Sequence, residues 1–370
     1  MNDVKNALNA AGIYTAVVLG AGFASGQEII RFFVRHGDAG YVGLSVAGVV
    51  FALSGWAVLD ISARLRLDGW DGFARAVFGE RLGKAVSAAS TLFIGVLFCA
   101  MLAGAGAMGR EAFGLPFSVG VLALAAVCFV IFLTGARGLL ALNAFLAPIL
   151  MAGGVFFGLY AFFTDAQPAF AGVRSAIGGD WVYSALTYAS YNVVTAITVL
   201  SGMRGMVNNR KTAKLAGLCG GLFLTALGFC FALPLYLNAG LYERVEIPMM
   251  LIARRHGRLI EGVYVFVLVA AIMTSAVANG FAVVDWICAR WGAKKTAVKL
   301  GVTLVCAAAA HTGFSELVGR VYPLFGLLGM FEVAAVILYF IFGEKSGSPA
   351  LRPVPRLPRT ADSSPARTTR

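Results

Sequence analysis

Charged residues are scarce in this chain of 370 residues. Asp, Glu, Lys and Arg make up 13% of it, which is about half of the roughly 25% found in soluble domains. Histidine occurs only three times, and the six cysteines are scattered through apolar stretches without a CxxC pair. These shortages argue against a soluble globular enzyme, a disulfide framework and a zinc centre.

Motifs that carry enzymatic or ATP-driven chemistry are also missing. The sequence contains no GxxxxGK[ST] loop, no HExxH helix and no GxSxG elbow. We therefore expect a protein that is not an enzyme, and we expect no cofactor other than a coupling ion.

Hydrophobic residues, in contrast, form 59% of the chain, and apolar runs of about 20 residues recur along it. A run of that length crosses a hydrocarbon core about 30 Å thick. The pattern predicts an all-α polytopic membrane protein. We expect ten spans, at residues 7–35, 41–63, 84–109, 117–135, 138–164, 181–203, 213–237, 258–288, 296–312 and 317–342.

The remaining segments are polar or amphipathic. Residues 68–83 and 246–257 read as amphipathic helices at the membrane interface. The spans form one domain over residues 1–343, and residues 344–370 form a basic tail rich in Pro, Ser and Arg that is expected to be disordered.

Lysine and arginine set the expected orientation. The net charge of +12 comes from short loops and the tail, so it indicates membrane topology rather than a nucleic-acid partner. Most basic residues fall on the side of the N-terminus, which places both termini in the cytoplasm of a plasma or bacterial inner membrane. A basic cluster at residues 254–258 counts against this orientation.

The first span loses its helical character at "GAGFASGQ", Gly20 to Gln27. Glycine is about 1 kcal/mol worse than alanine in a helix, and unpaired backbone groups are costly in lipid. The stretch therefore predicts a broken helix beside a cavity. The alternative is a glycine-lined packing face, since Gly22 and Gly26 fit the GxxxG pattern.

Span six contains a second polar stretch, "TYASYNVVT", Thr187 to Thr195. Span one is the first of spans 1–5, and span six is the first of spans 6–10. Breaks at matching positions in two such halves indicate an inverted-repeat transporter. The repeats would cover about residues 5–165 and 180–343. An interfacial aromatic belt is the alternative for span six. The predicted solute-binding residues are Gly20, Gly22, Phe23, Ser25, Gly26, Glu28, Tyr188, Ser190, Tyr191 and Asn192.

The stretch "GAGFASGQEIIRFF" closely resembles the first span of the YkvI-like membrane proteins. That family is proposed to contain amino-acid permeases of the amino acid–polyamine–organocation superfamily, which has the LeuT fold. The resemblance covers about residues 5–342. It implies a 5+5 inverted repeat with broken helices 1 and 6, and a central site between spans 1, 3, 6 and 8.

A shorter stretch, "AIMTSAVANG" from Ala271 to Gly280, is similar to span 8 of sodium-coupled LeuT-fold transporters. That resemblance implies a sodium ion held by the hydroxyls of Thr274 and Ser275 and the carbonyls of Ala21, Ala24 and Ala271. The alternative is that both hydroxyls bond to their own helix.

Three ionisable residues within the predicted spans are functional candidates, because charges there are costly and functional by default. Glu28 could bind a solute ammonium, carry a proton or pair with Arg31 one turn later, and Arg31 could form part of a gate. Glu332 has no basic neighbour in sequence, so it is expected to be protonated or hydrogen-bonded across helices.

These features favour a secondary active transporter of a small amine-bearing solute, such as an amino acid. Sodium would drive alternating access, in which spans 1, 2, 6 and 7 move against the rest. One alternative is proton coupling through Glu28 or Glu332. Another is a non-transporting membrane sensor whose tail recruits a protein partner; deleting residues 344–370 would abolish the output of a sensor but not the flux of a transporter.

Overall fold

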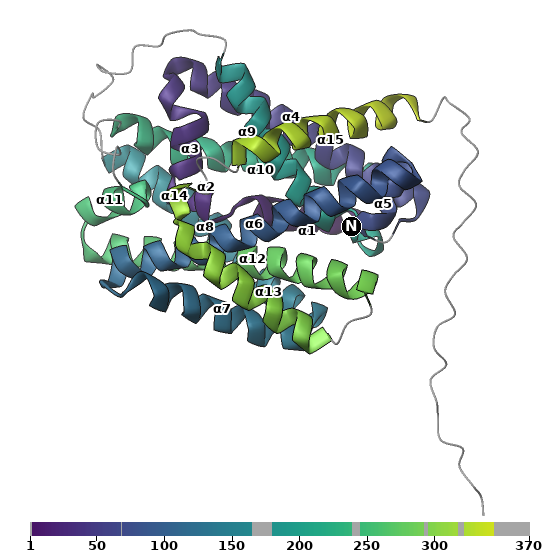
Figure 1. Ribbon diagram of the computed structural model, residues 1–370. Helices are drawn as coiled ribbons and strands as arrows, with labels where there is room; N and C mark the ends of the chain where they lie inside the picture. The colour runs from purple at the N-terminus through teal and green to yellow at the C-terminus, as the bar shows by residue number, and fades with distance from the viewer. Residues whose placement is uncertain are drawn as a thin grey trace, which may run out of the picture.

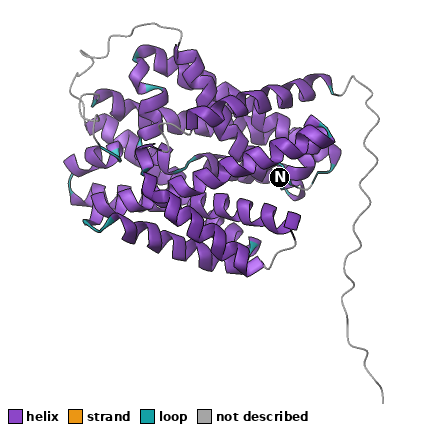
Figure 2. Ribbon diagram, in the orientation of Figure 1, coloured by secondary structure: helices purple, strands orange, loops and turns teal. Residues whose placement is uncertain are grey.

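The computed structural model describes residues 2–67, 69–164, 180–238, 245–291, 295–316 and 322–343. All regular secondary structure within these ranges is helical (Figure 2). The predicted tail and the first five residues of the predicted last span lie outside the described residues.

The helices follow the predicted spans closely. In chain order they are α1 (Asn2–Val18), α2 (Ala21–Ser25), α3 (Gln27–Phe32), η1 (Val34–His36), α4 (Asp38–Leu65), α5 (Trp70–Phe78), α6 (Glu80–Phe113), α7 (Phe117–Thr134), α8 (Ala136–Thr164), α9 (Asp180–Leu200), η3 (Met203–Gly205), α10 (Arg210–Leu237), α11 (Pro248–Arg255), α12 (Arg258–Trp291), α13 (Lys295–Ala309), η5 (Ala310–Thr312), α14 (Phe314–Glu316) and α15 (Tyr322–Phe342).

Six of these helices are long and apolar enough to cross a membrane, namely α4, α6, α7, α10, α12 and α15. The stretch Pro148–Thr164 of α8 adds a shorter apolar segment. The chain is therefore a multi-pass helical membrane protein, as its composition predicted. The count of ten spans and the inverted repeat stay predictions.

The long helices form two groups (Figure 1). One group contains α4, α9, α10 and α15, and the other contains α6, α7, α12 and α13; within each group the helices pack against one another. Helix α1 lies between them, because it contacts α9 and α10 on one side and α12 on the other. The first span is therefore at the centre of the molecule.

Glycines bring α10 and α4 into close contact. A Cβ atom at Gly217 would overlap the main-chain nitrogen of Trp56, and one at Gly221 would lie 2.6 Å from the Cα of Ala52. Small residues at such positions let helix backbones approach each other inside a membrane. The α4–α10 pair is thus held by backbone proximity rather than by large side chains.

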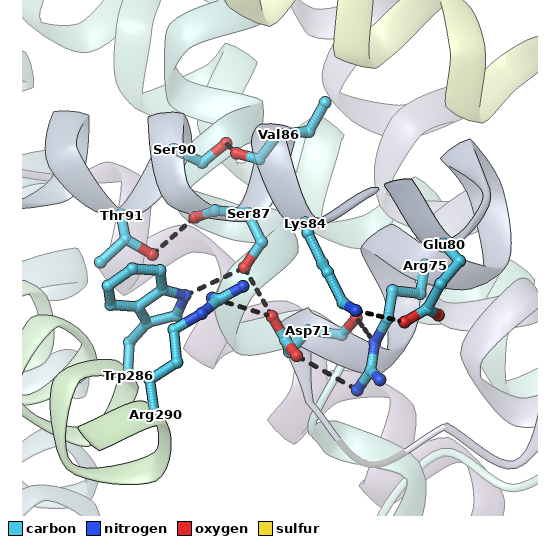
Figure 3. A network of polar contacts seen from close by, with 10 residues as sticks. All are labelled: Asp71, Arg75, Glu80, Lys84, Val86, Ser87, Ser90, Thr91, Trp286 and Arg290. Atoms are coloured by element: carbon cyan, nitrogen blue, oxygen red, sulfur yellow. Dashed lines mark hydrogen bonds and ion pairs between the residues drawn. The ribbon is translucent and has the colours of Figure 1, made fainter. Parts of the chain in front are cut away.

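Both predicted amphipathic segments contain helices. Helix α5 ends at Phe78 because Gly79 adopts a positive φ of 80° and α6 begins directly after it. The carboxylate of Asp71 accepts a hydrogen bond from Ser87 Oγ on α6 at 2.8 Å and lies 3.7 Å from Arg290 on α12 (Figure 3). Helix α5 is therefore tied to α6 and α12.

Candidate functional site: the interrupted first span

The first span is broken, as predicted from Gly20 to Gln27. Helix α1 ends at Val18, Gly20 is extended, and α2 has only five residues. Gly26 then adopts a left-handed φ of 87° between α2 and α3. A side chain at Gly26 would be strained, and its Cβ would lie 2.9 Å from Met249 Cγ of α11.

Side chains of α12 bond to backbone groups that the break exposes. Tyr264 of α12 donates its hydroxyl to the Ala24 carbonyl at 2.8 Å. Ser275, also on α12, donates to the Leu19 carbonyl at 3.4 Å. Since unpaired carbonyls are costly in lipid, these contacts explain how the break is tolerated within the membrane.

We expect Tyr264→Phe to destabilise the protein, because the buried Ala24 carbonyl loses its donor. Leaving a buried acceptor unsatisfied costs about 1–3 kcal/mol, so the thermal midpoint of the detergent-purified protein should fall. Tyr183→Phe is the matched control, since Tyr183 is 50% exposed. An equal midpoint for the Tyr264 variant and the control would contradict the assigned hydrogen bond.

Glu28 turns back towards the break. A Cβ atom at Gly22 would overlap Glu28 Oε1, so the carboxyl occupies the space left by the missing side chain. Glu28 is only 3% exposed, and its Oε2 atom has no hydrogen-bond partner among the described residues. A buried carboxylate without a partner is costly, and such a group calls for a ligand.

Aromatic rings from four helices pack together next to Glu28. Tyr191 of α9 lies 5.6 Å from Phe32 of α3 and 5.0 Å from Tyr322 of α15, measured between ring centroids. Tyr188 packs on Tyr191 at 5.6 Å, and Phe93 of α6 lies 6.3 Å from Tyr191. We call Glu28 and these five residues the Glu28 cluster.

The three tyrosine hydroxyls of the cluster, on Tyr188, Tyr191 and Tyr322, are buried and have no hydrogen-bond partner in the described part of the chain. Glu28 acts electrostatically on all three hydroxyls, and the Tyr191 hydroxyl lies within reach of its carboxyl. Buried polar atoms in native proteins almost always have partners. The cluster therefore combines one carboxyl, three hydroxyls and several ring faces that a polar ligand could use.

The predicted break in span six is wrong. Helix α9 is continuous from Asp180 to Leu200 and contains the whole stretch 187–195. Asn192 Nδ2 donates to the Tyr188 carbonyl at 3.0 Å, and Thr195 Oγ1 donates to the Asn192 carbonyl at 2.7 Å. These polar side chains bond to their own helix and do not interrupt it.

Other predicted solute-binding residues, namely Phe23, Ser25 and Ser190, make contacts that do not involve Glu28. Phe23 packs edge-on against Phe231 of α10 at 5.3 Å. Ser25 donates to the Gly22 carbonyl at 3.1 Å, and Ser190 packs against Gly329 of α15. Of the ten predicted residues, Gly22, Glu28, Tyr188 and Tyr191 meet at the cluster, whereas Tyr322, Phe93 and Phe32 were not anticipated.

The five predicted sodium ligands lie near one another, but four of their oxygens already have hydrogen-bond partners. Thr274 Oγ1 lies 2.9 Å from the Ala270 carbonyl and 3.0 Å from the Ala271 carbonyl. The Ala24 carbonyl accepts from Tyr264, and the Ala21 nitrogen donates to Met101 Sδ at 3.4 Å. Ser275 Oγ donates to the carbonyl of Leu19. This carbonyl lies two residues before that of Ala21, which was the predicted ligand.

Helix α11 covers one end of the break. Gln27 Nε2 donates to the Val245 carbonyl at 2.7 Å, in the segment that leads into α11. Glu246 pairs with Arg110 of α6 at 2.9 Å, and Arg254 pairs with Glu261 of α12 at 2.7 Å. The basic cluster that opposed the predicted orientation is thus partly paired with acidic side chains.

No protein-family model matches the chain. It is similar to the uncharacterized membrane protein YkvI of Bacillus subtilis (strain 168), with 25% identity over 328 residues, 88% of this chain and 94% of that protein. The resemblance noted at the first span is thereby confirmed.

Solved transporters of the LeuT type share the fold. The inward-facing form of Mhp1 superposes with a TM-score of 0.60 at 17% identity, over 92% of this chain and 77% of that one. A manganese transporter of Eremococcus coleocola gives 0.58 at 15% identity, over 93% and 88% of the two chains. A Na+-coupled sialic acid symporter gives 0.59 at 15% identity, over 90% and 78%.

Proposed function

We propose that the protein is a secondary active transporter of a small amine-bearing solute, with an amino acid as the leading candidate. The observation that carries the proposal is the Glu28 carboxyl, buried inside an interrupted central span among hydroxyls that have no partner among the residues the structure describes. The solved transporters with this fold carry chemically different cargoes, so the argument for the solute rests on the Glu28 cluster.

The chemistry of the cluster suits an ammonium group. A carboxylate forms strong charge-assisted hydrogen bonds with a cationic donor, and the faces of aromatic rings attract cations by about 0.5–2 kcal/mol. The tyrosine hydroxyls can accept further N–H donors. An ammonium ion at Glu28 would neutralise the buried charge, which offsets the cost of removing that charge from water.

In the proposed transport cycle, the two groups of helices move relative to each other. We propose ten spans in a 5+5 inverted repeat within residues 1–343, with both termini in the cytoplasm of the cell membrane. Movement of α4, α9, α10 and α15 together with the first span, against α6, α7, α12 and α13, would open the Glu28 cluster to each side in turn. The solute and a coupling ion are the partners, and no nucleic acid is involved.

We propose sodium as the coupling ion, bound between the first span and α12 after local rearrangement of Thr274 and Ala24. Purified full-length protein in liposomes should then accumulate radiolabelled amino acids only under an inward sodium gradient, with potassium as the replacement ion. Accumulation that is unchanged in potassium would contradict sodium coupling.

Ser275→Ala should raise the half-saturating sodium concentration about tenfold, since a lost hydrogen-bonding oxygen is worth about 1–1.5 kcal/mol. Thr303→Ala is the matched control, because Thr303 is a buried hydroxyl on α13 that bonds only to the Lys299 carbonyl among the described residues. An equal sodium dependence in the two variants would remove Ser275 from the ion site.

Proton coupling is the second candidate, and one observation favours it. Oxygens of the expected sodium ligands Thr274 and Ala24 are engaged in hydrogen bonds. Glu28 and Glu332, in contrast, each keep a buried carboxyl oxygen that has no partner in the described part of the chain. In this case uptake should persist without sodium and should follow an imposed pH gradient.

A further inference from the structure

Glu332 is a fully buried carboxyl in the middle of a membrane-crossing helix. It is 0% exposed, and α15 extends ten residues from it in either direction. At a rise of 1.5 Å per residue, each end of the helix is about 15 Å away. Water therefore does not reach Glu332 along α15 in this conformation.

The contacts of Ser90 indicate which protonation state Glu332 has. Ser90 Oγ on α6 lies 2.6 Å from Glu332 Oε1 and 2.9 Å from the Val86 carbonyl, and Figure 3 shows the second contact. A serine hydroxyl has a single proton to donate. If Glu332 were ionised, two acceptors would compete for that proton, and a buried charge would be left poorly solvated.

A protonated Glu332 satisfies both contacts at once. The acid donates its proton from Oε1 to Ser90 Oγ, and Ser90 donates its own proton to the Val86 carbonyl. Within the described ranges, only the neutral Oε2 atom then lacks a partner, which costs less than an unpaired charge. The Ser90 geometry therefore fits a carboxylic acid better than a carboxylate.

Charged groups on the neighbouring helices are engaged elsewhere. On α4, Asp60 lies 2.8 Å from Arg64; on α5, Asp71 lies 3.1 Å from Arg75; and on α6, Glu80 lies 2.7 Å from Lys84. From α9, the main chain at Ser190 and Tyr191 approaches α15 at Gly329, one turn from Glu332. No ion pair among the described residues reaches Glu332.

The Glu332–Ser90 contact also joins the two helix groups. Helix α15 packs on α9 and α4, whereas Ser90 belongs to α6, which packs on α12 and α7. One turn further along α6, Phe93 contacts Tyr191 and Tyr322 of the Glu28 cluster. A movement that opens the cluster would therefore pull Ser90 away from Glu332.

We propose that Glu332 and Ser90 form a proton-binding site that is occupied when α6 and α15 are together and released when they separate. On release, the Oε1–H bond breaks, the proton passes to water that enters between the helices, and a hydrated carboxylate remains. This inference rests on the proton-coupled form of the proposed transport function, the second candidate above, and it assigns the coupled proton to Glu332 rather than to Glu28.

The protonation state can be measured directly by infrared spectroscopy of the full-length protein in lipid nanodiscs. Wild-type protein should show the C=O stretch of a hydrogen-bonded carboxylic acid that is lost in Glu332→Gln and retained in Glu28→Gln. Ser90→Ala should shift this band, Ser90→Thr should restore it, and Thr91→Val should leave it unchanged, because Thr91 bonds only to the Ser87 carbonyl among the described residues. A spectrum in which Glu332→Gln removes no acid band overturns the proposal.

The coupling role is tested in liposomes with a mixture of radiolabelled standard amino acids. With a gradient of about one pH unit, one coupled proton can sustain up to about tenfold accumulation, because about 1.4 kcal/mol corresponds to a tenfold ratio. Glu332→Gln, which keeps the shape and a donor, should equilibrate the same solutes without accumulation. Equal pH-driven accumulation in this variant and in wild type overturns the coupling.

The two proposals fail in different ways. If no amino acid is transported under any gradient, the transport function is wrong, and the infrared spectrum alone confirms or overturns the protonated Glu332. If solutes are transported but the acid band persists in Glu332→Gln, only the proton site is wrong.

Discussion

Replacing Glu28 with glutamine will lower the affinity for the transported solute by about ten- to a hundredfold. The amide keeps the shape of the side chain but loses the charge that pairs with an ammonium group. Hydrogen bonds to charged groups contribute about 1.5–3 kcal/mol, and 1.4 kcal/mol corresponds to a tenfold change in affinity. Equilibrium binding of radiolabelled amino acids to the purified protein measures the effect.

Two controls separate charge from folding in this experiment. Glu261→Gln removes a carboxylate that is 25% exposed on its side chain and pairs with Arg254, so solute affinity should stay unchanged. Gly22→Ala keeps the charge of Glu28 but fills the space its carboxyl occupies, and it should weaken binding as well. Wild-type affinity in both the Glu28 and the Gly22 variants would rule out the Glu28 cluster as the solute site.

The second large effect concerns stability. Gly221→Val will strongly reduce the amount of folded protein, because the Cβ atom alone meets the Ala52 backbone at 2.6 Å. A backbone cannot move aside as a side chain can, and overpacking a core costs about 1–3 kcal/mol even when side chains can adjust. The yield of monodisperse protein and its thermal midpoint report this loss.

Gly262→Ala provides the comparison for that variant. Gly262 lies within α12, and nothing lies within 4 Å of the position its Cβ would occupy. Alanine should therefore be neutral or stabilising by up to about 1 kcal/mol through helix propensity. A Gly221 variant as stable as the Gly262 variant would show that α4 and α10 are not in backbone contact.

The sequence contained enough information to locate the first break. Glycines at positions 20, 22 and 26 lower helix propensity within three turns, and a carboxylate follows directly. Span six has a similar density of polar residues but no glycine between Thr187 and Thr195. Its amide and hydroxyl groups can bond to carbonyls three or four residues earlier, so polarity alone did not break the helix.

Contacts between residues far apart in the chain could not be predicted from the sequence. Tyr322 and Phe93 lie in ordinary apolar stretches, and no periodic pattern connects them with Glu28. Glu332 could be identified as an isolated carboxyl, but its partner Ser90 is 242 positions away. Only the side-chain contacts between α6 and α15 in the folded protein bring this pair together.

The contacts of Asp71 limit where α4 can move relative to α5, α6 and α12. Because Asp71 fixes α5 to α6 and α12, any rotation of α4 relative to those helices must be absorbed in the short connection between α4 and α5. Two residues there, Arg66 and Gly69, adopt positive φ angles of 56° and 101°. Gly69 donates its backbone N–H to the Ser201 carbonyl at 3.3 Å. A rotation of α4 that changes the backbone at Gly69 would therefore break this hydrogen bond to the end of α9.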